Sequence, residues 1–237
     1  MRSFDVLILG AGAAGLMCAA QAGKRGRKVA LIDHSTKPGG KIPVSGGGRC
    51  NFTNTGASAR QYVSENPDFC RSALSRFTPS DFVRLLEEHR IGFHERKHGQ
   101  LFCDGSARQI VDLLVGECRM AEVEILSGHR ILALSRSGPG FAAKTDHGEF
   151  SAPSAVVATG GLSIPEGGAT GLGYGIAAQF GLKLVETAPA LDGFVFRPRE
   201  AEAFAVLAGV SADARAGCRG RSFRENILFT HEGLSGP

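Results

Sequence analysis

The amino-acid sequence predicts an α/β fold built on a parallel sheet of the Rossmann type. The prediction rests on a short apolar run at residues 4–9, a glycine-rich turn at 10–15 that opens a helical pattern, and a second apolar run at 28–33. A strand, a helix and a second strand in this order form a βαβ unit, whose two strands pair in parallel. We therefore expect a nucleotide-binding core at the start of the chain.

The composition is that of an ordinary globular protein. Of 237 residues, 43% are hydrophobic and 21% are charged, which excludes wholesale disorder. The net charge of +4 is too small to indicate a nucleic-acid or membrane partner, and we expect neither. Residues 6–23 carry no charge, but ten of these eighteen are Gly or Ala, which argues against a membrane span or a targeting segment. The six cysteines show neither a C-x-x-C pair nor zinc spacing, so we expect a cytoplasmic protein with reduced thiols and no metal site.

The glycine-rich turn at 10–15 follows the dinucleotide-binding pattern. Gly10 permits a tight turn, Gly12 lets backbone N–H groups approach a pyrophosphate, and Gly15 lets helix and strand pack closely. The start of the following helix adds a positive potential for phosphate groups. The alternative is a glycine turn that binds no ligand.

Asp33 ends the second strand, eighteen residues after Gly15. A carboxylate at this place accepts hydrogen bonds from ribose hydroxyls and repels a 2′-phosphate. The pattern therefore disfavours NADP and leaves FAD or NAD.

Residues 34–56 form a long segment rich in Gly, Ser, Pro and Asn, which we interpret as a loop. It leaves the βαβ unit beside the expected ribose, and Lys41 and Arg49 can offset phosphate charge. NAD-binding domains need no such second loop, so it favours FAD, whereas the alternative is a flexible surface loop. Cys50 has no cysteine close to it in sequence and is interpreted as a small residue beside the cofactor.

The middle of the chain predicts two helices and a meander. One helix begins at Thr78, with Pro79 in its first turn, and another follows the capping-box pattern at 106–109. Strand-like runs at 123–126, 130–135 and 141–145 predict an antiparallel meander. A buried strand at 155–158 ends in Thr159, Gly160 and Gly161, where small residues let the backbone pass close to a ligand.

From residue 188 the pattern changes to short β-like pieces with many arginines. We interpret Arg215, Arg219, Arg221 and Arg224 as a solvated strand face, because no aromatic residues are interleaved in a nucleic-acid-binding pattern. Residues 231–237 resemble a loop about to enter a helix, which suggests a piece of a longer chain.

Several of these motifs resemble one flavoprotein family, the aminoacetone-oxidase-like, BaiN-type NAD(P)/FAD-dependent oxidoreductases. They are GAGAAG with Asp33, SGGGRCN at 45–51, ATGG at 158–161, GATGLGYG from Gly168, and FTHEGLSGP at the end. The resemblance implies a flavoprotein of the two-dinucleotide-binding type with an inserted, mostly-β domain. Residues 1–187 would form the FAD-binding domain, with the meander at about 123–151, and 188–237 the start of the inserted substrate domain.

The resemblance also implies the residues that hold FAD. They are Gly10, Gly12, Gly15, Asp33, Lys41, Gly47, Gly48, Arg49, Asn51 and Gly160, and a backbone group near Ile131 would contact the adenine. The neighbouring Ala11, Ala13, Ala14, His34, Cys50, Thr159 and Gly161 complete the candidate site.

The expected function is hydride transfer between FAD and a small organic substrate, with NAD(P)H as the electron donor. No catalytic residue is assigned. Two alternatives stay open: a dinucleotide-binding module without catalysis, and a flavoprotein that acts on RNA.

Overall fold

The computed structural model describes residues 1–163, 168–189 and 192–236. The chain divides into two compact units, Met1–Lys183 and Leu184–Pro237, and each is described by itself. None of the helices in the described part of the chain has the length and apolar character needed to span a bilayer.

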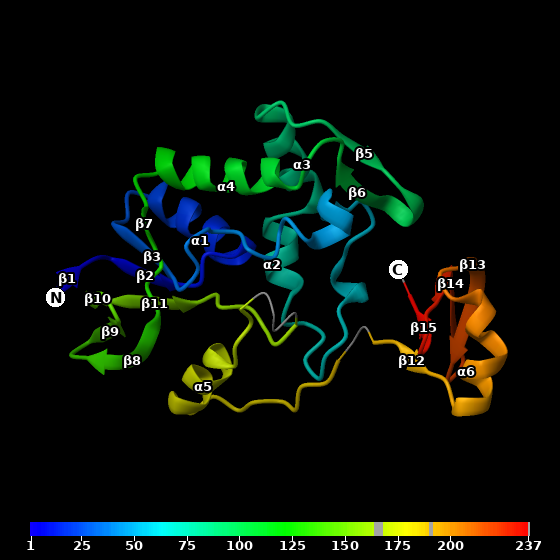
Figure 1. The fold of residues 1–237 in the computed structure, drawn as a ribbon. Coiled ribbons are helices and arrows are strands. Elements are labelled where there is room, and N and C mark those ends of the chain that lie inside the picture. The colour runs from blue at the N-terminus through cyan, green and yellow to red at the C-terminus, as the bar shows by residue number, and fades with distance from the viewer. Residues whose placement is uncertain (164–167, 190–191, 237) are drawn as a thin grey trace. The chain divides into compact units, whose positions relative to one another are not determined.

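A parallel four-stranded sheet forms the centre of the first unit (Figure 1). Its strand order is β11-β2-β3-β7, with β2 (Val6–Leu9), β3 (Val29–Asp33), β7 (Glu124–Ser127) and β11 (Ser154–Val157). Helix α1 (Ala13–Gly23) connects β2 to β3 and confirms the predicted βαβ unit. Both central strands are almost entirely buried, as expected of a parallel sheet covered on its two faces.

One face of this sheet is covered by helices. Helix α4 (Arg108–Met120) packs against α1, and its Ile110, Leu114 and Cys118 belong to the same buried cluster as Leu16 of α1. The predicted capping box at 106–109 is not formed, because Ala107 is the N-cap residue; the hydroxyl of Ser106 instead accepts a hydrogen bond from the Arg108 N–H (3.2 Å).

Helix α3 (Pro79–Glu88) begins as predicted. The Thr78 hydroxyl accepts a hydrogen bond from the Asp81 N–H, and the Asp81 carboxylate accepts one from the Thr78 N–H. The Thr78 hydroxyl also donates to the Asp81 carboxylate (2.6 Å), and this bond, together with the one from the Thr78 N–H, holds the pKa of the Asp81 carboxyl below its usual range. A shorter helix, α2 (Arg71–Arg76), precedes α3.

The antiparallel meander consists of β8 (Ile131–Ser137), β9 (Gly140–Thr145) and β10 (Gly148–Ala152), and β1 (Arg2–Ser3) adds to β10 in parallel. The prediction that 123–126 is its first strand was wrong, because residues 124–126 belong to β7, which pairs in parallel with β3. β7 is an edge strand whose side chains are only partly buried. The sequence of such a strand shows the same alternation whether the sheet is parallel or antiparallel, so it does not identify the sheet.

A third sheet lies within the first unit, in the order β4-β6-β5. Its strands are β4 (Asn51–Asn54), β5 (Phe93–Glu95) and β6 (Gln100–Cys103), so the predicted loop at 34–56 ends in a strand. Short 3-10 turns occur at Ser45–Gly48, Ala59–Gln61 and Lys97–Gly99. Helix α5 (Leu172–Gln179) follows the parallel strand β11.

The second unit has one antiparallel sheet in the order β12-β15-β14-β13. Its strands are β12 (Phe194–Val195), β13 (Ser211–Cys218), β14 (Arg221–Phe229) and β15 (Gly233–Ser235), with helix α6 (Pro198–Phe204) and a 3-10 turn at Ala205–Leu207. Residues 233–235 were expected to lead into a helix, but they pair with β12 and β14 as β15, while Pro237 lies outside the described residues. Gly233 allows this pairing, since a Cβ there would lie 1.6 Å from the carbonyl oxygen of Phe194.

Candidate dinucleotide site

A cavity of about 710 Å³ lies within the first unit, at the carboxyl ends of β2, β3 and β11. This is where sheets of the Rossmann type bind ligands, and the volume is within the usual range of small-molecule sites. The predicted residues that line it are Gly10, Ala11, Gly12, Ala13, Ala14, Asp33, His34, Lys41, Cys50, Asn51, Thr159 and Gly160.

The glycine turn after β2 contains two glycines that packing requires. Gly10 has a φ of +105°, and a Cβ there would lie 2.5 Å from the carbonyl oxygen of Ala158. A Cβ on Gly15 would lie 1.8 Å from the carbonyl oxygen of Gly10. Gly15 does not line the cavity, so its role is the close packing of helix against turn that the motif predicts.

Gly12 differs from both. No atom lies within 4 Å of the place where its Cβ would be, and the residue lines the cavity. Nothing in the described fold therefore requires a glycine at this position. The space is suited to a ligand that approaches the first turn of α1, where backbone N–H groups and the helix dipole favour phosphate.

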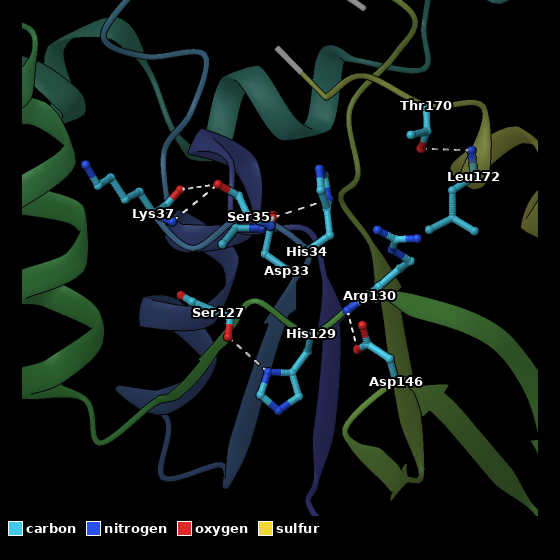
Figure 2. Close-up of polar contacts among 11 residues, drawn as sticks. Asp33, His34, Ser35, Lys37, Ser127, His129, Arg130, Asp146, Thr170 and Leu172 are labelled. Carbon is cyan, nitrogen blue, oxygen red and sulfur yellow. Dashed lines mark hydrogen bonds and ion pairs between the residues drawn. The ribbon is translucent and has the colours of Figure 1, made fainter. Parts of the chain in front are cut away.

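The Asp33 carboxylate holds the end of β3 against the glycine turn. Its Oδ2 accepts a hydrogen bond from the Ala11 N–H (2.5 Å) and its Oδ1 accepts one from the Ser35 N–H (2.7 Å). His34 Nδ1 lies 3.5 Å from Oδ1 (Figure 2). The motif predicted a contact with a ribose and missed this structural role. A carboxylate has about four acceptor sites, so the side chain, 14% exposed, keeps capacity for a ligand.

The segment after Asp33 lies beside the glycine turn and the turn after β11. The Gly39 N–H donates a hydrogen bond to the carbonyl oxygen of Ala11 (2.7 Å). The Lys41 ammonium donates to the carbonyl oxygen of Gly161 and to the hydroxyl of Ser163, each at 3.4 Å. Gly161 thus contacts Lys41 and does not line the cavity. The ammonium brings positive charge to the cavity wall.

Gly46, Gly47 and Gly48 are successive left-handed residues, with φ values of +57°, +66° and +87°. Gly48 and Arg49 do not line the cavity; their carbonyl oxygens accept hydrogen bonds from the N–H groups of Ala107 and Cys103, both 2.9 Å. Gly47 is also outside the lining. Direct contacts of Gly47, Gly48 and Arg49 with a cofactor stay predictions.

Cys50 lines the cavity in a strained left-handed conformation (φ +51°). Its neighbour across the β4–β6 pair is Cys103, because Asn51 pairs with Phe102. Burial raises the pKa of the Cys50 thiol, and its hydrogen bond with Ser45 partly opposes this shift. Burial is also the main reason why the pKa of the Cys103 thiol rises to about 11, with smaller contributions from the nearby Cys50 and Asp104. Both thiols therefore keep their protons at neutral pH. The cysteines are far apart in sequence, which is why their proximity could not be predicted.

Thr159 carries the clearest sign of a missing partner. Its Oγ1 is buried and has no hydrogen bond within the described residues, although the residue lines the cavity. Unpaired buried hydroxyls are rare and costly. Together with the open space at Gly12 and the Lys41 charge, this hydroxyl fits a ligand that carries phosphate and further polar groups, as FAD does.

Ile131, predicted to lie near adenine, is in β8 paired with Thr145 and is not part of the cavity lining. The segment before it is tied to the end of β3, since the His129 N–H donates to the carbonyl oxygen of Asp33 (2.8 Å). The Arg130 N–H donates to the Asp146 carboxylate (2.8 Å), and His129 Nδ1 lies 3.0 Å from the Ser127 carbonyl oxygen (Figure 2). A contact of Ile131 with adenine stays a prediction.

Comparison with known proteins identifies relatives over nearly the whole chain. A family model described as the HI0933-like protein Rossmann domain matches residues 4–233. The ribosomal RNA dihydrouridine synthase of Escherichia coli K12 is 48% identical over 238 residues, which cover 100% of this chain and 60% of that protein. The protein of the same name from Haemophilus influenzae is 43% identical, over 98% of this chain and 59% of its own length. The chain thus spans about three fifths of these relatives.

A more distant relative is the 3-dehydro-bile acid delta(4,6)-reductase of Clostridium scindens, 32% identical over 88% of this chain and 51% of that protein. It agrees with the flavoprotein family indicated by the sequence motifs. These three relatives, however, are named as ribosomal RNA dihydrouridine synthases and a bile-acid reductase, and not as aminoacetone oxidases.

Solved structures support the fold alone. Glycine oxidase from Geobacillus kaustophilus has a TM-score of 0.55 at 15% identity, over 78% of this chain and 60% of its own. The Diels-Alderase PyrE3 of pyrroindomycin biosynthesis has a TM-score of 0.52 at 16% identity, over 94% of this chain and 46% of its own.

Proposed function

Because the chain belongs to the HI0933-like protein family, we propose that it is the cofactor-binding part of an FAD-dependent reductase acting on a carbon–carbon double bond conjugated to a carbonyl group. The observation that carries the proposal is the cavity at the end of the βαβ unit, with open space at Gly12 and an unpaired hydroxyl on Thr159.

This chain's residues would hold FAD through three kinds of contact. The N–H groups of Gly12, Ala13 and Ala14, at the start of α1, would bind the diphosphate, with Lys41 offsetting its charge. Asp33 would accept hydrogen bonds from a ribose. Bound FAD would supply the redox chemistry, accepting hydride from NAD(P)H and delivering it to carbon.

Another part of the cavity lining is apolar. Phe52, Leu74, Phe77 and Phe82 contribute to it, and rings of Phe52 and Phe82 lie 5.7 Å apart. Such a surface would exclude water beside a planar ring system, which protects a hydride donor from side reactions.

The names of the relatives suggest the substrate class. A dihydrouridine synthase saturates the uracil double bond next to a ring carbonyl, and a delta(4,6)-reductase of a 3-dehydro-bile acid acts on ring double bonds beside a ketone. When a double bond directly conjugated to a carbonyl is reduced in this way, hydride adds to the carbon β to the carbonyl and a proton adds to the α carbon. We propose uridine in ribosomal RNA, because the relatives at 48% and 43% identity share that name. This proposal replaces the expectation of no nucleic-acid partner.

The proposal is tested with the full-length natural protein that contains this chain. Purified protein should be yellow, and its flavin should be bleached anaerobically by NADH or NADPH in stopped flow. Unmodified ribosomal RNA should reoxidise it and gain two hydrogens at one uridine, measured by mass spectrometry; a bile-acid enone is the comparison substrate. Protein that stays colourless with added FAD contradicts the cofactor, and bound flavin that no hydride donor reduces identifies a non-catalytic module.

Asp33→Ala should weaken FAD binding at least about tenfold, equivalent to about 1.4 kcal/mol. The matched control is Asp5→Ala. Asp5 also accepts a hydrogen bond from a backbone N–H, that of Lys28 (2.8 Å), but it lies at the other end of β2, away from the cavity. Equal FAD affinity in both variants would remove Asp33 from the site.

A further inference from the structure

The tip of the β13–β14 hairpin in the second unit concentrates positive charge. Residues 215–224 contain Arg215, Arg219, Arg221 and Arg224 and no acidic residue. All ten residues of this segment are exposed. The base of the hairpin differs, because the rings of Phe196, Phe204 and Phe229 pack there at 5.2–6.5 Å. The arginines therefore lie on the part of the hairpin that the unit's own aromatic cluster does not cover.

The turn holds these arginines on a regular ladder. Cys218 pairs with Arg221, and the two residues between them, Arg219 and Gly220, have φ values of +48° and +77°. A two-residue turn with both φ values positive matches the twist of a hairpin and gives a well-defined tip.

Among the described residues, only Arg224 of these four arginines has a charge partner, and Arg219 and Arg221 have no side-chain partner at all. Arg224 forms a bidentate ion pair with Asp213 (2.7 and 3.1 Å), and Arg215 donates to the Ser222 hydroxyl (3.4 Å). In contrast, neither Arg219 nor Arg221 has an ion pair or side-chain hydrogen bond to any residue that the structure describes. Their guanidinium groups are free to contact an anionic partner.

An exposed aromatic ring lies among these charges. Phe223 is 71% exposed and is placed opposite Ala216 in the ladder. Residues two apart in a strand share a face, so Phe223 and Arg221 point to the same side. The interpretation of this arginine cluster as a plain solvated face rested on the lack of an interleaved aromatic, and Phe223 supplies one.

We propose that this hairpin tip is a docking surface for single-stranded or looped RNA. Arg219 and Arg221 bind phosphates, and Phe223 stacks on a base. The inference rests on the proposed RNA substrate, and it assigns recognition to a unit that does not contribute to the cofactor cavity.

The test is binding of a fluorescein-labelled RNA stem–loop to the full-length protein, measured by fluorescence anisotropy at several salt concentrations. The R219A/R221A variant should bind at least about tenfold more weakly, and the slope of log affinity against log salt should fall by about 1.4 for two lost phosphate contacts. Phe223→Ala should lower affinity about tenfold with an unchanged slope, because stacking involves no counterion release.

The matched control is R25A/R27A, which removes the same Arg-Gly-Arg pattern from exposed positions in the first unit. It should bind RNA as the unaltered protein does. Flavin absorbance and reduction by NAD(P)H should be the same in every variant, so loss of RNA binding is separable from failure of the flavin site.

Two results would overturn the docking surface. One is unchanged RNA affinity in R219A/R221A. The other is protection of the Arg219 and Gly220 amides from hydrogen exchange without RNA, because these two residues lie in the turn outside the ladder and would be protected only if another part of the polypeptide covered them. RNA bound through the tip but never reduced would support the surface and contradict the proposed uridine substrate.

Discussion

The two glycine-rich segments of the first unit, residues 10–15 and 45–48, use glycine for different physical reasons. In the first, Gly10 and Gly15 are required because another backbone group lies where a Cβ would be. In the second, Gly47 has open space around it and is required by its left-handed φ of +66°. Gly12 fits neither description, since its φ is ordinary and its surroundings are empty. Similar composition thus arises from packing, backbone conformation and ligand approach.

Gly15→Ala should have the largest effect. A Cβ 1.8 Å from the Gly10 carbonyl oxygen cannot be accommodated without moving α1 away from the turn. We expect the free energy of unfolding to fall by about 3 kcal/mol, the upper end for overpacking, measured by urea denaturation. Gly116→Ala is the control, because it lies in α4 with nothing within 4 Å and should be neutral or stabilising. Equal stability of the two variants would contradict the packing role.

Gly12→Ala should leave stability almost unchanged and weaken FAD binding. The new methyl group enters space that the fold leaves open and that we assign to the diphosphate. We expect affinity to fall about 10- to 100-fold, equivalent to about 1.4–2.8 kcal/mol, in a fluorescence titration of the apoprotein. Retained affinity would show that the open space is not part of the cofactor site.

Gly47→Ala should cost about 1 kcal/mol of stability, because an L-residue is strained in the left-handed region but meets no neighbour here. Its effect on FAD affinity should be smaller than that of Gly12→Ala, since Gly47 does not line the cavity. A larger loss of affinity than in Gly12→Ala would reverse the comparison and support the cofactor contact that the family resemblance implies.

The smallest effect concerns Cys50, which lies two residues after the second segment. Its pKa is raised above the ordinary 9.0, so the reactive thiolate forms only at higher pH. In the folded protein at pH 8, iodoacetamide should modify the exposed Cys218 well before Cys50, as followed by mass spectrometry. Bound FAD should slow Cys50 further because the residue lines the cavity. Equal rates for both cysteines would contradict the burial of Cys50.

Local patterns predicted the parts of the fold that local interactions decide. The βαβ unit follows from the apolar runs and glycines of the first thirty-three residues, and the start of α3 follows from Thr78 and Asp81. The glycines and Asp33 also predicted a ligand site at the carboxyl ends of the strands, and a cavity lies there, because parallel strands bring these ends to one edge of the sheet.

Long-range pairing was beyond these patterns. β7 belongs to the parallel sheet because it pairs with β3, and the four residues of this edge strand contain no pattern from which that pairing could be predicted. For the same reason, the sequence could not predict that Cys103 lies beside Cys50 or that the Ala11 N–H donates to Asp33. The two residues of each pair are far apart in sequence and come together only in the folded chain. Whether Phe223 is buried or exposed also depends on where along the hairpin the aromatic cluster packs, and it packs at the base.

Both backbone polar groups of Ala11 are already bonded within the protein, its N–H to Asp33 and its carbonyl oxygen to Gly39. The glycine turn is therefore preorganised, and little conformational entropy is lost when a diphosphate settles on it. The apoprotein should therefore bind FAD without a change in the conformation of this turn. Association should proceed in one bimolecular phase, with a rate proportional to FAD concentration and no slow rearrangement after it.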